Sequence, residues 1–244
     1  MKLMTIAYKE DPPSEMLYYR CLNVKKIYPD SKLMIVVTKE LENATKDLVS
    51  NFNHVEVIPM DLDDTRPLTR WKLIYHGYKI IKDDIMHCGP LTFFKKDIRP
   101  ILNLDKVNIL YSKIEMIHPD IITHMKKIVI SLRIKWNFNE TVHNSFMFLP
   151  ANAFNQLEKI NSLIESHQHK LSIHSKDLQN IYIANYALFQ FKDQLFLLKD
   201  ILKQLTNLET NKETSFMYNT QIEDPYLLYT YPHEFEKVKH EIPI

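Results

Sequence analysis

Glycine is nearly missing from this chain of 244 residues, which holds only Gly77 and Gly89. A dinucleotide-binding fingerprint needs three closely spaced glycines, and a P-loop needs glycine ahead of lysine and serine or threonine. Neither pattern occurs here. The scarcity of glycine therefore argues against dinucleotide binding and against P-loop phosphoryl transfer.

Cysteine, long apolar runs and an excess of charge are lacking as well. Cys21 and Cys88 are too few for a disulfide framework and favour a reducing compartment. The sequence contains no run of about 18 apolar residues, so no transmembrane helix is predicted. The N-terminus becomes polar too soon for a signal peptide. The formal net charge of +1 gives no general attraction to nucleic acid or anionic membranes. We therefore expect a soluble, cytoplasmic protein, whose oligomeric state the sequence leaves open.

Short apolar runs alternate with amphipathic stretches over the first hundred residues. The strands are predicted at 2–8, 32–38, 55–60 and 85–88, and the helices at 14–27, 39–52 and 67–81. This order predicts an α/β fold with a mostly parallel central sheet flanked by helices. Ligands bind such sheets at the carboxyl ends of the strands.

The second half of the chain is less regular. Strands are predicted at 106–110, 127–134 and 142–149, helices at 119–125, 151–166, 178–189 and 195–208, and an extended tail after a polar loop at 209–221. The chain shows no linker between the halves, so we expect one domain, residues 1–244.

Several short sequence motifs follow one another in an informative order over residues 1–200. Strand one ends in Ala7-Tyr8-Lys9, the next helix contains Arg20-Cys21-Leu22-Asn23 before Tyr28-Pro29-Asp30, and a later helix carries Arg70-Trp71-Lys72. Residues 91–98 read LTFFKKDI, and residues 144–149 read NSFMFL. Together these pieces resemble the GT-A class of glycosyltransferases.

The resemblance implies a fold and an activity. It implies a nucleotide-sugar-binding half over residues 1–102 and an acceptor-side half over 103–244. It also implies transfer of a sugar from a nucleotide-sugar donor to a hydroxyl of a glycan, a protein or a modified nucleic acid. GT-A enzymes usually carry Asp-x-Asp just before the segment that LTFFKKDI resembles, and its carboxylates hold Mn²⁺ or Mg²⁺ on the donor diphosphate.

The chain departs from the family at that motif, because the matching positions read His87-Cys88-Gly89-Pro90-Leu91. Three explanations stay open. Arginine and lysine side chains neutralise the diphosphate without a metal, or a metal binds elsewhere through Asp61, Asp63 or His87, or the fold is kept for binding without catalysis.

The resemblance also suggests roles for single residues. The donor-binding candidates are Tyr8, Lys9, Asp61, Arg70, Lys72 and His87. Asp177 and His143 are candidates for the group that deprotonates or orients the acceptor, since an inverting transfer needs a base. Most of the donor-side and metal candidates have a plainer alternative: Asp61 and Asp63 as helix caps, Arg70 and Lys72 as surface charges, His87 as a core histidine, and Tyr8 and Lys9 as ordinary loop packing.

Overall fold

A seven-stranded sheet forms the centre of the computed structural model, in the order β3-β2-β1-β4-β7-β6-β8. The structure describes residues 1–9, 14–62, 68–113, 126–127, 129–130, 140–168, 186–205 and 222–244. The strands are β1 (Lys2–Ala7), β2 (Leu33–Thr38), β3 (Val55–Met60), β4 (Ile85–Cys88), β6 (Asn108–Lys113), β7 (Glu140–Leu149) and β8 (Phe196–Lys199). Strands β3, β2, β1 and β4 are mutually parallel, and β7 runs antiparallel to β4 and β6. The predicted mostly parallel α/β sheet is therefore confirmed.

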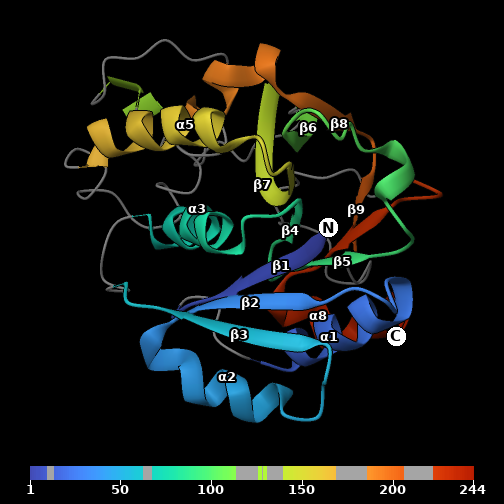
Figure 1. Ribbon diagram of the computed structural model, residues 1–244. Helices are drawn as coiled ribbons and strands as arrows, with labels where there is room; N and C mark the ends of the chain where they lie inside the picture. The colour runs from blue at the N-terminus through green and yellow to red at the C-terminus, as the bar shows by residue number, and fades with distance from the viewer. Residues whose placement is uncertain are drawn as a thin grey trace.

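Helices cover both faces of the sheet (Figure 1). One face carries α1 (Glu15–Ile27) and α2 (Glu42–Val49), which follows the short helix η1 (Lys39–Leu41); the other carries α3 (Thr69–Ile81) and α5 (Phe154–Ser166). Successive residues of a strand point to opposite faces, so β1 sends Leu3 and Ala7 into the α1 side and Met4 and Ile6 into the α3 side. Each face of the sheet thus has its own apolar core.

Gly77 allows α3 to lie close against the sheet. A Cβ atom at this position would lie 2.8 Å from Met4 Sδ and 2.9 Å from Val36 Cγ2. Side chains of β1 and β2 therefore occupy the space that any larger residue would need.

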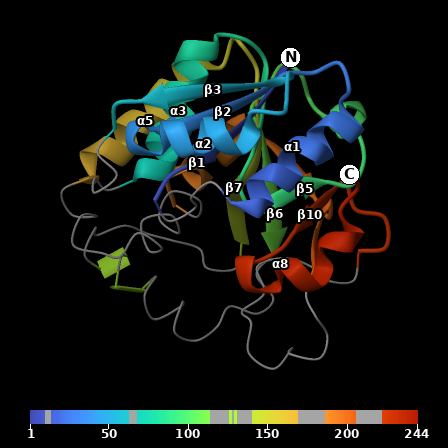
Figure 2. The same cartoon turned by 90° about the horizontal axis from the view of Figure 1, so that it is seen from below.

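A second, three-stranded sheet lies beside the first and brings the C-terminus back to α1 (Figure 2). It contains β5 (Thr92–Phe94), β10 (Leu227–Tyr229) and β9 (Leu202–Gln204), in the order β5-β10-β9. The helix α8 (Pro232–Val238) follows β10, and η6 (Lys239–Glu241) ends the chain. Phe235 of α8 packs against Phe93 of β5, with ring centroids 6.1 Å apart. The remaining short helices are η2 (Arg99–Ile101) and η4 (Phe189–Gln194).

The predicted strands at 55–60 and 85–88 have the bounds found in the structure, whereas α3 begins later than predicted. Its N-cap is Leu68, in a left-handed conformation with φ of 68°, and Asp61 lies seven residues before it. The interpretation of Asp61 as the cap of this helix is therefore wrong. In α5, Phe154 was expected on the buried face but is 41% exposed, because the helix starts at this residue.

Two predictions in the second half are wrong. The helix expected at 195–208 is instead the strand pair β8 and β9, separated at Asp200, whose φ of 52° interrupts regular structure. The strand expected at 127–134 is helical at the described residues 127, 129 and 130. Short apolar runs do not distinguish strand from buried helix by periodicity alone. The helices expected at 119–125 and over most of 178–189, and the loop at 209–221, lie outside the described residues.

Candidate functional site

The helix α1 fixes the segment that follows β4. The Asn23 amide donates to Phe94 O at 2.8 Å and accepts from Phe94 N at 2.8 Å, as a strand partner would. Near the end of the helix, Tyr28 Oη accepts from Ile98 N at 3.0 Å. The sequence pieces that carried the resemblance, around Asn23 and over 91–98, are therefore in contact with each other.

Arg20 belongs to the same set of contacts and is only 1% exposed. Its Nη2 donates to Gly89 O at 2.8 Å and to Pro90 O at 3.1 Å, and its guanidinium carbon lies 4.5 Å from the centroid of the Phe93 ring. Its Nε and Nη1 are buried and have no hydrogen-bond partner among the described residues. Arg20 thus holds the turn after β4 with part of its guanidinium and leaves the remainder unsatisfied.

Arg70 approaches the same turn from the other face of the sheet. It lies in the first turn of α3 and is half-buried. A Cβ atom on Gly89 would lie 3.0 Å from Arg70 Nη2 and 3.2 Å from both Cα and O of Ser145. Gly89 therefore leaves room for the Arg70 guanidinium at the carboxyl end of β4.

His87 lies inside the sheet, fully buried, beside its strand partners Met4 and Met147 on the α3 side. Burial, together with the positive charges of Arg70 and Arg20, lowers the pKa of the ring from 6.5 to about 3, whereas the backbone of Met4 and Asn144 opposes the shift. The imidazole is therefore neutral at physiological pH, and the interpretation of His87 as a core histidine fits its position.

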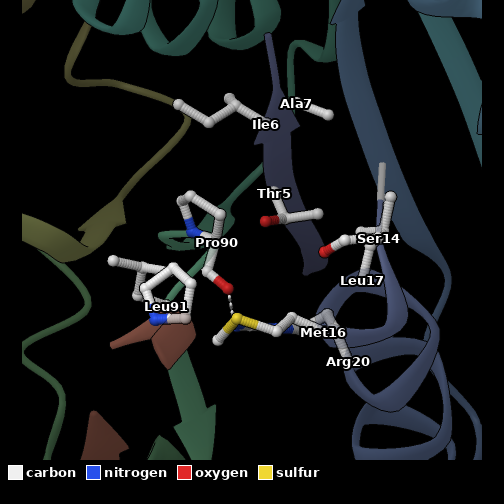
Figure 3. Close-up of a pocket in the computed structure, with 10 residues that line it drawn as sticks. Thr5, Ile6, Ala7, Ser14, Met16, Leu17, Arg20, Pro90 and Leu91 are labelled. Carbon is white, nitrogen blue, oxygen red and sulfur yellow. Dashed lines mark hydrogen bonds between the residues drawn. The ribbon is translucent and has the colours of Figure 1, made fainter. Parts of the chain in front are cut away.

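A cavity of about 210 Å³ opens between the carboxyl-terminal half of β1, the start of α1 and the turn at Pro90 (Figure 3). Thr5, Ser14, Met16, Arg20, Pro90 and Pro232 are among the residues that line it. Pro232 begins α8, so the C-terminal part of the chain supplies one wall. The cavity lies at the strand edge where α/β sheets bind ligands.

The other predicted donor-site residues lie around this edge in different environments. Tyr8 is 4% exposed and packs in the α3-side core, which leaves little of its ring for a nucleotide. Lys9 and Asp61 are exposed at the ends of β1 and β3. Lys72 Nζ donates to Gln168 Oε1 at 3.4 Å, beyond the end of α5.

The remaining predicted residues cannot be placed. Asp63 and Asp177 lie outside the described part of the chain. His143 lies in β7, where its backbone pairs with Leu110, but its side chain is not described. Their roles as metal ligand, base or acceptor-binding group stay predictions.

The described residues near Gly89 do not fit a divalent cation. Hard oxygen ligands suit Mn²⁺ or Mg²⁺, but residues 87–91, where the resemblance expects the two aspartates, contain no carboxylate. No cluster of three histidine, cysteine, aspartate or glutamate side chains occurs among the described residues. Asp61 and His87 cannot share one ion, because β3 and β4 are three strands apart, or roughly 14 Å. The Cys88 thiol donates to Thr92 O at 3.2 Å, and burial raises its pKa, so it stays protonated.

Arg20 was absent from the residues predicted for the site, although the sequence carries a signal for it. It follows Leu17 by three residues and precedes Val24 by four, so it shares their helix face. Leu17 and Val24 are buried, as expected. A charge on an otherwise apolar face is the informative exception to the burial rule.

Comparison with known proteins places this geometry in a structural class. No family model matches the chain, and no curated protein matches its sequence. Solved glycosyltransferase structures do match, and the chain has their GT-A fold, as the resemblance predicted. The mouse xyloside xylosyltransferase 1 matches with a TM-score of 0.58 and 10% identity, over 96% of this chain and 98% of that one.

Two further glycosyltransferase structures match to a similar degree. The galactosyltransferase LgtC, solved with donor and acceptor sugar analogs, has a TM-score of 0.56 and 11% identity over 96% of this chain and 88% of that one. The glycosyltransferase GlyE of Streptococcus pneumoniae has a TM-score of 0.50 and 10% identity, over 93% of this chain and 54% of that one.

Proposed function

We propose that this protein is a glycosyltransferase that transfers a sugar from a nucleotide-sugar donor to a hydroxyl group. The observation that carries the proposal is the position of Arg70 over Gly89, at the carboxyl end of β4 in a GT-A fold. Ligands of open α/β sheets bind at this edge. Guanidinium groups bind phosphate oxygens in a bidentate geometry.

The reaction needs several groups at the carboxyl end of the sheet, each with its own role. The bond between the sugar and the diphosphate breaks, the acceptor oxygen bonds to the sugar, and the acceptor proton passes to a base. Arg70, with Lys9 or Lys72, balances the charge that grows on the diphosphate. Asp61 contacts the nucleoside together with the small part of Tyr8 that is exposed, and Asp177 or His143 takes the proton or orients the acceptor.

The proposal extends to the kind of acceptor and to the cellular compartment. The acceptor is a hydroxyl of a glycan, a protein or a modified nucleic acid. Residues 1–102 form the donor half and 103–244 the acceptor half of one domain, in the cytoplasm. Within the described residues, no helix is long and apolar enough to cross a membrane.

A thermal-shift panel tests the proposal on the full chain. UDP, GDP, CDP and dTDP are added singly, with Mn²⁺ or with EDTA. We expect one nucleotide to raise the melting temperature, because a ligand that binds only the folded state stabilises it. If none of the four raises it, the proposed function is wrong.

A second candidate function is that of a GT-A-fold binding protein without catalysis. The observation that favours it is the lack of a carboxylate at residues 87–91, where the resemblance expects Asp-x-Asp. Hydrolysis of a nucleotide sugar separates the two functions. The control is Arg99→Ala, which changes an exposed arginine paired with Asp97. If the wild type and Arg99→Ala release nucleotide above background and Arg70→Ala does not, the protein is not merely a binding protein.

A further inference from the structure

Arg20 is a buried cation without a counter-charge among the described residues. Its side chain contacts two carbonyl oxygens and one aromatic ring, but no carboxylate of the described chain pairs with it. A buried charge that lacks a partner is strongly unfavourable, and buried arginines are normally paired. The arrangement suggests that the missing anion belongs to a ligand.

The cavity beside Arg20 provides the space for such an anion. Thr5 Oγ1, fully buried in the same cavity wall, also has no hydrogen-bond partner in the described part of the protein. Two kinds of donor, a guanidinium and a hydroxyl, are therefore unsatisfied around one space. At about 210 Å³ the cavity is smaller than a typical drug-sized pocket, so it fits one charged group rather than a whole nucleotide.

Met16 lines the same cavity as Arg20, and both belong to α1 (Figure 3). Methionine is unbranched and adapts its conformation easily, so this wall of the cavity can adjust to a group that enters from the strand edge.

The charges around Gly89 determine which kind of ion the turn attracts. Arg20 holds the Gly89 carbonyl from the α1 side, and Arg70 lies beside the same residue from the α3 side. Burial is the main cause of the low pKa of His87 in β4, and the charges of Arg70 and Arg20 lower this pKa as well. Two guanidinium groups at one residue attract an oxyanion and repel a divalent cation.

We propose that this cavity is an oxyanion pocket in which Arg20 and Thr5 bind a phosphoryl group of the donor diphosphate. The fixed charges of Arg20 and Arg70 then take the place of the divalent cation. This inference rests on the proposed function, because it assigns the diphosphate of the same donor to the pocket.

Isothermal titration calorimetry of the full chain tests the pocket with two probes: the nucleoside diphosphate that gives the largest thermal shift, and pyrophosphate. The variants are Arg20→Met, which removes the charge and keeps an unbranched side chain, and Thr5→Val, which removes the hydroxyl at nearly constant volume. Arg99→Met is the matched control. Each protein is titrated in EDTA and again with Mn²⁺.

We expect the wild type and Arg99→Met to bind the nucleotide equally well with EDTA or Mn²⁺. Arg20→Met should raise the Kd for both probes about 10- to 100-fold, and Thr5→Val by about 3- to 10-fold, as expected for lost hydrogen bonds to a charged group. The melting temperature of the free Arg20→Met protein is measured alongside, because the variant loses both an unpaired buried charge and the hydrogen bonds to Gly89 O and Pro90 O.

The outcomes distinguish the pocket from the function as a whole. If the wild type binds no nucleoside diphosphate, the proposed function and the pocket are both wrong. If it binds only with Mn²⁺, or if Arg20→Met binds as tightly as the wild type, only the pocket is wrong. Should Arg20→Met fail to fold, Thr5→Val decides, and a Kd unchanged from the wild type overturns the inference.

Discussion

Gly77 and Gly89, the two glycines of the chain, lie in regions that are packed in opposite ways. Around Gly77 the contacts are apolar and tight, with Met4 and Val36 in the place of a side chain. Around Gly89 a side chain would meet the tip of Arg70 and the backbone of Ser145. The first glycine brings a helix close to the sheet, and the second leaves room for a charged group.

The polar groups of the two regions differ in the same way. On the Gly77 side, Trp71 Nε1 donates to Asn161 Oδ1 at 3.1 Å, and Tyr78 Oη donates to Pro150 O at 2.8 Å. Near Gly89, buried polar atoms of Thr5, Arg20, Thr92 and Asn144 have no partner among the described residues. Since each unsatisfied buried group costs about 1–3 kcal/mol, we infer that the Gly89 region gives up stability that a ligand restores.

The largest effect on stability is expected from Gly77→Ala. The new methyl group would overlap Met4 and Val36, and overpacking of this kind costs about 3 kcal/mol at the upper end of its usual range. Urea denaturation of the variant measures the loss of unfolding free energy. Lys79→Ala, at an exposed position of the same helix, should change it by less than about 0.5 kcal/mol. A loss below about 1 kcal/mol for Gly77→Ala would show that the α3 side is not tightly packed.

A smaller effect is expected from the titration of His87. The ring has a pKa of about 3 in the folded protein and 6.5 when unfolded. Between these values the unfolded chain binds a proton that the folded chain does not, so stability falls as the pH decreases. From high pH down to about pH 5, this group alone should remove about 2 kcal/mol.

Urea denaturation at several pH values, repeated with His87→Phe, isolates that contribution. Phenylalanine is similar in shape and does not titrate, so the variant should lose less stability below pH 6.5 than the wild type does. Equal pH dependence of the two proteins would mean that His87 titrates normally. In that case the His87 ring would not be desolvated as its burial in the structure indicates.

The fold of the first half could be predicted from sequence because each strand there is a short apolar run between helical repeats. The bounds of β3 and β4 were predicted without error. The strands after α5 could not be predicted from sequence, because they form only by pairing with distant parts of the chain. β8 pairs with β6, and β9 with β10. Leu195, Leu198 and Leu202 have helical spacing, yet they lie in or beside these strands.

For the candidate site, the sequence suggested a region of the chain but not all of the residues that meet there. The resemblance located the turn at Gly89 and suggested Arg70, which the structure places there. Arg20 escaped prediction as a site residue because helix spacing shows that a residue shares a buried face but not what it contacts. Its contacts with Gly89 and Pro90 join residues about 70 positions apart.

The smallest effect on stability is expected from Gly89→Ala, and it is the closest counterpart of Gly77→Ala. The structure gives Gly89 no positive φ, so alanine can adopt its backbone conformation. Alanine also restricts the unfolded chain, which stabilises by about 0.4–1 kcal/mol. Against this, its Cβ would lie 3.2 Å from the Ser145 backbone, which must shift slightly, whereas the Arg70 tip can move aside. We expect the unfolding free energy in urea to change by less than about 1 kcal/mol. A loss as large as that of Gly77→Ala would mean that the turn is as closely packed as the α3 side, and that Gly89 is there for packing rather than for charge.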